Sequence, residues 1–333
     1  MQYYRGPDKE IWDGRIDSKD EYDSFRWHQI VRLINLRDKK LDDIEAGFGF
    51  LGFCCDEGVK RNKGRIGASK GPIHIRKELA NLPVNFKNEV GLYDCGNFYC
   101  EDQKLLKAQK RIGRGIEKML NNGLFPVVLG GGHETAYGHF LGINSFLKNK
   151  KLSEKKLGII NFDAHFDLRP CKAGGNSGTM FTQIADITKS ENMGFNYLCT
   201  GIQISGNTRS LFKKAEKLGV EYIFAKDIKS YNLIKIFEKI DNFISRNDYI
   251  YITICSDVFS SAFAPGVSSP QPFGMDPENV LTIFKHILKS EKVISFDISE
   301  VSPRFDSDNR TAKLAAIIIF ALVNNLTKLY EKL

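Results

Sequence analysis

The chain has 333 residues, of which 42% are hydrophobic and 26% charged, a composition that is typical of globular proteins and excludes a disordered chain. Its 48 Lys and Arg against 40 Asp and Glu give a net charge of +8, but these residues are interleaved, which favours a solvated surface over nucleic-acid binding. The polar start carries no export signal and the longest strongly apolar stretch, 314–323, is far below the ~20 residues that span a membrane, so no membrane contact is expected.

Short apolar segments alternate along the chain with longer amphipathic ones, the pattern of alternating strands and helices. Strands are predicted at 48–54, 90–94, 125–129, 157–162, 197–201, 221–224, 249–254 and 293–298. Helices are predicted at 73–81, 104–121, 135–148, 208–218, 228–245, 277–289 and 310–332. The order predicts an α/β fold: a single three-layer αβα domain with a largely parallel, doubly wound sheet.

The N-terminal residues bear on the organisation of the chain, and the cysteines bear on its location. Residues 1–45 are polar and are predicted to form a helical N-terminal extension packed on the edge of the domain 46–333. The seven cysteines are odd in number and contain no C-x-x-C pair, which excludes a zinc finger and a secreted disulfide framework. We therefore expect a cytoplasmic protein.

Polar clusters directly follow three of the predicted strands. They are the GGGHE segment Gly130–Glu134, the DAHFD segment Asp163–Asp167, and the CSD segment Cys255–Asp257. Sites in open α/β sheets form beyond the carboxyl ends of strands. The first cluster alone is equally compatible with a glycine turn, and a single histidine with a structural role.

The alternation of Asp163, His165 and Asp167 is harder to explain without a ligand. A period of two places three acceptors on one face of an extended segment, at a cost in repulsion and desolvation unless a cation compensates. Two histidines with several carboxylates suit a divalent ion of intermediate hardness, such as Mn²⁺. Bridging carboxylates could hold two ions, and such a pair can deprotonate a water.

These segments resemble the arginase/agmatinase (ureohydrolase) family in residue type, order and separation, over about residues 48–330. The resemblance is greatest to its formimidoylglutamase branch, through 52–65, 71–72, 133–139, 163–169, 177–179, 201–203 and 264–268. It implies an arginase-like fold, a homo-oligomer and a binuclear manganese site. The positions that match family metal ligands are His133, Asp163, His165, Asp167 and Asp257. Glu300 matches the carboxylate that holds the guanidino or formimino group.

Cys255 departs from the family, which has an aspartate that bridges both ions at this position. Three interpretations stay open: a direct thiolate ligand that favours a softer metal, a weakened or mononuclear site, and a plain buried thiol. A fourth, in which Cys255 is a nucleophile toward the amidine carbon, ranks lower because the aspartate–histidine set already supplies a metal site.

Two other departures concern the substrate. Phe181 stands where arginases carry a proton-shuttling histidine, which weighs against arginase activity. Arg169 stands where arginases carry an asparagine, and a guanidinium there suits a substrate with two carboxylates, although a surface ion pair is an equal alternative. The substrate-binding candidates are Arg169, Asn176, Ser177, Asn62 and Arg65. For the last two, a loop held by its own backbone is the alternative.

The resulting hypothesis is metal-dependent hydrolysis of N-formimidoyl-L-glutamate to L-glutamate and formamide, a step of histidine breakdown. A hydroxide held by the metals would attack the formimino carbon, Glu300 would orient the amidinium, and Asp167 would carry a proton to the leaving amine. The alternatives are another ureohydrolase that acts on arginine, agmatine or guanidinobutyrate, and a metal-poor, non-catalytic family member.

Overall fold

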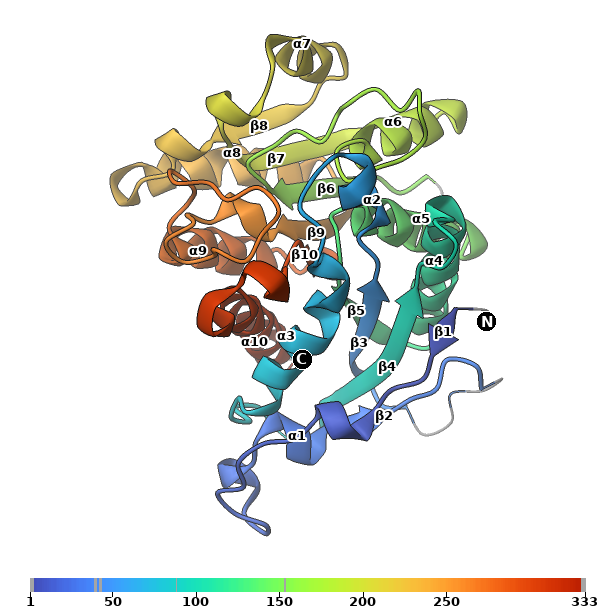
Figure 1. The fold of residues 1–333 in the computed structure, drawn as a ribbon, viewed down its shortest axis with the longest axis vertical. Helices are drawn as coiled ribbons and strands as arrows, with labels where there is room; N and C mark the ends of the chain where they lie inside the picture. Colours follow the sequence, from blue (N-terminus) through green and yellow to red (C-terminus); the bar gives the residue numbers. More distant parts are fainter. Residues whose placement is uncertain (1–2, 39–40, 42–43, 88, 153, 331–333) are drawn as a thin grey trace.

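The computed structural model describes residues 3–38, 41, 44–87, 89–152 and 154–330. Its centre is a sheet with eight parallel strands (Figure 1). In spatial order they are β4 (Gly91–Tyr99), β3 (Gly47–Cys54), β5 (Leu124–Leu129), β10 (Val293–Ser299), β9 (Tyr249–Cys255), β6 (Leu157–Phe162), β7 (Asn196–Ile202) and β8 (Glu221–Phe224). All eight strands predicted from the sequence are present, with ends shifted by a few residues.

Helices cover both faces of this sheet (Figure 1). One face packs against α3 (Gly71–Ala80), α8 (Leu233–Ser245), α9 (Pro277–Leu288) and α10 (Arg310–Tyr330). The other packs against α4 (Leu105–Asn121), α5 (Thr135–Asn149), α6 (Met180–Ser190) and α7 (Arg209–Lys217). The predicted three-layer αβα architecture is confirmed.

The side chains of β9 explain why its sequence is a continuous apolar segment. Ile250, Ile252 and Ile254 enter the core shared with α8, α9 and α10, whereas Tyr251 enters the core on the opposite face. Successive residues of a strand point to opposite faces, so a strand covered on both sides is apolar throughout. Thr253 is the exception, and it lies near the functional site.

The helical extension expected at residues 1–45 is not what the structure has. The described part forms strands β1 (Tyr4–Arg5) and β2 (Arg32–Leu33) along the outer edge of β4, together with the four-residue helix α1 (Trp27–Ile30). Trp12 donates from Nε1 to Oδ2 of Asp94 at 2.7 Å, and Trp27 is fully buried. The segment is therefore held by edge pairing and anchored tryptophans.

Helix α6 was not predicted, and the segment predicted as helix from residue 228 is helical in α8 only from Leu233, after two 3₁₀ turns. The segment Ser307–Lys328 has 22 residues and a mean hydropathy of 1.3 over an 18-residue window, so it is long and apolar enough to cross a membrane by length and composition. Within the described chain it packs on α3 and α9 and contributes to the core, as a buried helix does.

Candidate metal centre

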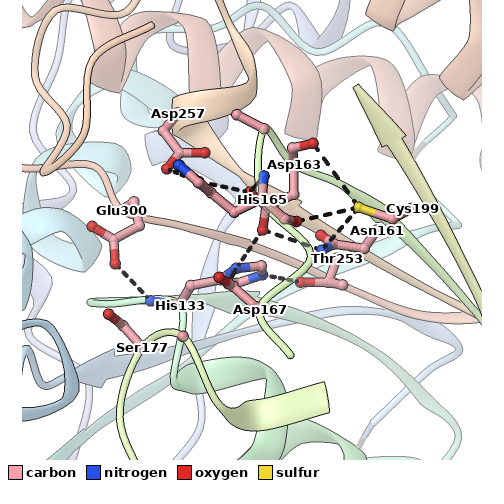
Figure 2. A network of polar contacts seen from close by, with 12 residues as sticks. His133, Asn161, Asp163, His165, Asp167, Ser177, Cys199, Thr253, Asp257 and Glu300 are labelled. Carbon is pink, nitrogen blue, oxygen red and sulfur yellow. Dashed lines mark hydrogen bonds and ion pairs between the residues drawn. The ribbon is translucent and has the colours of Figure 1, made fainter. Parts of the chain in front are cut away.

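The four central strands of the sheet, β5, β10, β9 and β6, are neighbours, and all end at the same edge. The loop after β5 carries His133, the loop after β6 carries Asp163, His165 and Asp167, and the ends of β9 and β10 carry Cys255, Asp257 and Glu300. The parallel register thus brings together residues that are up to 167 positions apart. Figure 2 shows six of these side chains converging on one region: His133, Asp163, His165, Asp167, Asp257 and Glu300.

Asp163 is at the centre of two sets of possible metal ligands. Ligand atoms of His133, Asp163 and Cys255 lie within 4.8 Å of one another, and so do those of Asp163, His165 and Asp257. Because Asp163 belongs to both sets and has two carboxylate oxygens, it could contribute a ligand atom to each set. Its Oδ2 also accepts from Asn161 Nδ2 at 3.2 Å, and its Oδ1 accepts the His165 backbone N–H at 2.8 Å.

Asp167 joins this cluster through His133, whose Nδ1 lies 3.0 Å from Asp167 Oδ2 and 3.0 Å from Asp163 Oδ2. Asp167 and Glu300 both have left-handed backbones, with φ of 50° and 68°. Non-glycine residues rarely adopt this conformation, and it is found preferentially where a site requires a particular direction of the side chain. In both residues the turn directs a carboxylate into the cluster.

Burial makes the charges of this cluster costly. It raises the pKa of Asp167 to about 7, with a further contribution from the Asp163 charge, and it raises the pKa of Glu300 well above its usual range. Burial lowers the pKa of His133 and His165, but the neighbouring aspartates outweigh this and hold both above 6.5. Protons balance the carboxylates here, and divalent cations could replace those protons.

Two carboxylate oxygens in the cluster have no hydrogen-bond partner among the described residues, although both are buried. They are Oδ1 of Asp257 and Oε2 of Glu300. An unpaired buried carboxylate oxygen costs free energy, which a cation or a cationic substrate would recover. The donor set therefore fits a metal ion at Asp257 and leaves one oxygen of Glu300, a residue of the cavity lining, without a partner among the described residues.

A layer of polar residues supports the ligands from inside the sheet. His133 Nε2 lies 3.0 Å from Thr253 Oγ1, and this hydroxyl donates to Asp297 Oδ1 at 2.8 Å. Asp297 Oδ2 in turn lies 2.7 Å from His139 Nδ1. Partners of this kind fix the orientation and tautomer of a metal-binding histidine.

Sequence reasoning missed three supporting residues. Thr253 and Asn161 each stand two positions before a cluster residue, Cys255 and Asp163, so the strand period places them on the same side of their strand. This spacing of two was the sequence signal that could have identified Thr253 and Asn161. Asn207 holds the loop after β6, because its Oδ1 accepts the Phe166 N–H at 3.0 Å, and a distant loop gives no local pattern for that contact.

A cavity of about 300 Å³ opens above the cluster. It is lined by Asn62, Lys63, Gly64, Arg65, His133, His165, Asp167, Arg169, Ser177, Gly206, Asn207, Leu211, Cys255, Asp257, Ser268, Ser269 and Glu300. Four of the five predicted substrate-binding residues are therefore in this lining. Asn176 is not, because its side chain accepts the Gly178 N–H at 2.8 Å in a local turn. Lys63, Ser268 and Ser269 were not predicted.

The predicted substrate-binding residues differ in how free their polar groups are. Arg65 donates to the carbonyls of Val267 at 2.6 Å and Ser268 at 3.1 Å, and its guanidinium lies over the Phe305 ring at 4.2 Å. Arg169 is exposed, and within the described chain its guanidinium has no hydrogen bond or ion pair. Arg169 is therefore available to a ligand, whereas Arg65 shapes the wall.

Comparison with known proteins finds relatives over nearly the whole chain. A sequence model of the arginase family matches residues 46–324. Formimidoylglutamases from Clostridium tetani and from Geobacillus sp. WCH70 are 52% and 46% identical to this chain, covering 98% and 94% of it and 97% and 94% of their own lengths.

Solved structures show the same fold. A Bacillus subtilis formimidoylglutamase superimposes with a TM-score of 0.78 at 21% identity, covering 93% of this chain and 94% of its own. A Trypanosoma cruzi formiminoglutamase with Mn²⁺ superimposes with a TM-score of 0.74 at 23% identity, covering 87% of this chain and 96% of its own. The chain belongs to the arginase family.

Proposed function

We propose that this chain hydrolyses N-formimidoyl-L-glutamate to L-glutamate and formamide. The names and the high identity of its formimidoylglutamase relatives support this reaction. The observation that carries it is the pairing of two free groups of opposite charge in one cavity: the unpartnered Oε2 of Glu300 and the unpartnered guanidinium of Arg169, as far as the described residues extend. The substrate has the matching ends, a cationic amidine and carboxylates.

Glu300 would receive the amidine end. Its Oε1 accepts the backbone N–H of His133 at 2.9 Å, which fixes the carboxylate and leaves Oε2 for the N–H donors of an amidinium. A charged hydrogen bond of this kind is stronger than a neutral one. Glu300 would thereby hold the formimino carbon next to Asp163 and Asp167.

The carboxylates of the substrate would be bound at the outer part of the cavity. Arg169 can bind one of them bidentately, and the Ser177 hydroxyl, which accepts from Asn62 Nδ2 at 3.2 Å, can donate its own hydrogen to the other. Arg65 would keep the wall in place. This arrangement selects a substrate with an acid end over a purely cationic one such as agmatine.

Manganese, as two ions, is the proposed cofactor. The residues that would hold it are His133, Asp163, His165, Asp167, Asp257 and Cys255. Such a metal pair supplies an activated water and a Lewis acid that polarises the reacting carbon. The Mn²⁺ of the Trypanosoma cruzi neighbour supports this choice, and Cys255 is the one donor softer than Mn²⁺ prefers.

Asp167 would move the proton in this reaction. Its carboxyl lines the cavity, and its raised pKa of about 7 in the metal-free protein reflects an environment that favours the protonated form. The bond between the formimino carbon and the substrate nitrogen breaks, and Asp167 would deliver a proton to that nitrogen, so that it leaves as the amino group of glutamate.

Formamide release from N-formimidoyl-L-glutamate tests the proposal, with protein loaded with Mn²⁺ and with the same protein after chelation. We expect release only from the loaded protein, none from Asp163→Ala, and for Arg169→Ala mainly a rise in KM. Turnover by Asp163→Ala would contradict the metal mechanism. Urea from a guanidino substrate, without formamide, would identify a different ureohydrolase.

The location of the protein, its assembly and its ligand class also belong to this proposal. All seven cysteines are free thiols, as a reducing compartment maintains them, which supports a cytoplasmic protein. The homo-oligomer implied by the family resemblance stays a prediction, as does the binding of a small amidine ligand and not of nucleic acid.

A further inference from the structure

A second cluster of reactive side chains lies at the carboxyl ends of β3 and β4. Cys54 of β3 pairs with Tyr99 of β4 in parallel register, so the next residues, Cys55 and Cys100, leave the two strands side by side. Neighbouring strands are about 4.8 Å apart. This spacing is within the range of about 4.4–6.8 Å that joins the Cα atoms of a disulfide.

The two thiols differ in exposure. Cys55 is buried at 2% exposure, whereas Cys100 is partly exposed. Both line a cavity of about 500 Å³ that shares no lining residue with the metal centre. The single S–H of Cys55 can donate either to Oε1 of Glu134, at 3.6 Å, or to the Cys100 sulfur, and the second of these hydrogen bonds lowers the pKa of Cys100. A small reagent can therefore reach Cys100 first, with Cys55 behind it.

We propose that Cys55 and Cys100 form a reactive thiol pair, which low-molecular-weight disulfides convert to an intramolecular disulfide. Dithiols in reducing compartments that become oxidised are usually transient or redox-sensing ones. An accessible thiol backed by a second thiol is the arrangement that such sites use. Formation of this disulfide does not require the proposed substrate reaction.

The chemistry is two exchange steps. The Cys100 thiolate attacks one sulfur of the reagent disulfide, the reagent S–S bond breaks, and the first reagent thiolate leaves. The Cys55 sulfur then attacks the Cys100 sulfur, its proton passes to the second departing thiolate, and the protein disulfide forms. Two electrons pass from the protein thiols to the reagent, which is reduced to two thiols.

The pair is also connected to the metal centre. The carbonyl oxygen of Cys55 accepts the backbone N–H of Gly132 at 2.8 Å, one residue before His133. A Cβ at Gly131 would lie 1.9 Å from the same oxygen, so the two backbones are in close contact. A disulfide at Cys55 also removes the thiol that donates to Glu134. We therefore expect oxidation to lower turnover, an effect that rests on the proposed function.

The test incubates the metal-loaded protein with cystamine, followed by intact mass, peptide mapping and formamide release. The wild type should lose two hydrogens by formation of a disulfide between Cys55 and Cys100, and lose activity that dithiothreitol restores. Mapping separates this link from a cysteamine adduct at Cys171, the other partly exposed cysteine. Cys55→Ser should keep a stable cysteamine adduct at Cys100, because the second step is missing.

Cys54→Ser is the matched control, since Cys54 is the adjacent buried thiol and contacts Asn97 instead. It should form the same link as the wild type. A link between Cys54 and Cys55, or an unchanged mass at both proposed cysteines, would overturn the pair. If the disulfide forms but formamide release is unchanged, the connection to the metal centre is refuted. If the protein releases no formamide even before oxidation, only the proposed function is contradicted.

Discussion

The backbone N–H of His133 donates to Glu300 Oε1 at 2.9 Å, which joins the loop after β5 to the carboxylate at the end of the neighbouring strand β10. One oxygen of Glu300 is therefore used by the protein and the other is left for a ligand. The same contact thus positions Glu300, which would hold the amidine, and His133, which would hold a metal. Each residue constrains the other.

Glu300→Gln should separate these two roles. The amide oxygen can still accept the His133 N–H, so folding and metal content should be preserved, but the charge that faces the amidinium is lost. A hydrogen bond to a charged group contributes about 1.5–3 kcal/mol, so kcat/KM should fall by about 10- to 100-fold or more. Steady-state kinetics and metal analysis measure both. Normal kinetics in the variant would exclude Glu300 as the amidinium partner.

The residues that converge at the site could be predicted because they belong to short local patterns. The alternation of Asp163, His165 and Asp167 is visible in five residues, and the end of a strand places it at the site edge. The substrate-binding residues could not be predicted in this way. Arg65 was predicted to bind substrate, but carbonyls 202 and 203 positions away occupy its guanidinium, and no local pattern reveals that contact.

The prediction of a helical N-terminal extension was wrong because contacts with residues distant in the sequence decide its structure. Residues 3–38 are fixed by pairing with β4 and by the burial of Trp12 and Trp27, which are non-local interactions that override local helix or strand preference. The fold of residues from 46 on could be predicted, because its strands and helices alternate with strong periodicity and are covered on both sides.

Thr253 offers a test of the layer beneath His133. Thr253→Val keeps the shape of the side chain but removes the hydroxyl that links His133 Nε2 to Asp297. Loss of such an outer partner typically costs about 10- to 100-fold in metal affinity. We expect weaker Mn²⁺ binding by titration calorimetry for Thr253→Val and near-normal binding for Thr253→Ser. Equal affinities in both variants would show that the link does not position the ligand.

Cys255 is tested by a metal whose spectrum reports thiolate ligation. If its sulfur completes the set with His133 and Asp163, the Co²⁺-loaded protein should show a near-ultraviolet band from sulfur-to-cobalt charge transfer. Cys255→Ala should remove the band. Cys199→Ala should keep it, because the Cys199 thiol donates to the backbone carbonyls of Asp163 and His165 instead. A band that survives Cys255→Ala would exclude this ligand.

The same residue should set metal preference. Cys255→Asp replaces a soft sulfur by a hard oxygen, so the ratio of Mn²⁺ to Zn²⁺ affinity should rise, by an expected factor of about ten, or about 1.4 kcal/mol. Competition between the two metals, followed by metal analysis, measures the ratio. An unchanged ratio would place the thiol outside the coordination sphere and leave the second set, Asp163, His165 and Asp257, as the site of the principal ion.

Metal affinity should also depend on pH. In the metal-free protein, burial lowers the pKa of His133 and His165, but the aspartates around them outweigh burial and hold both values above 6.5. The raised pKa values favour the protonated form of both rings, whereas a metal binds the neutral imidazole. Protons compete with the metal, so affinity should rise with pH as these raised pKa values are approached and fall on acidification.

Calorimetric titration of Mn²⁺ at several values between about pH 6 and about pH 8 measures this trend around the usual histidine range. Binding should release protons, which makes the observed enthalpy depend on the ionisation enthalpy of the buffer. His286→Gln is the matched control, because His286 lies on α9 and pairs with Asp241 outside the site, and it should leave the pH profile unchanged. Affinity that does not vary with pH, or binding without proton release, would mean that His133 and His165 are already neutral before the metal arrives.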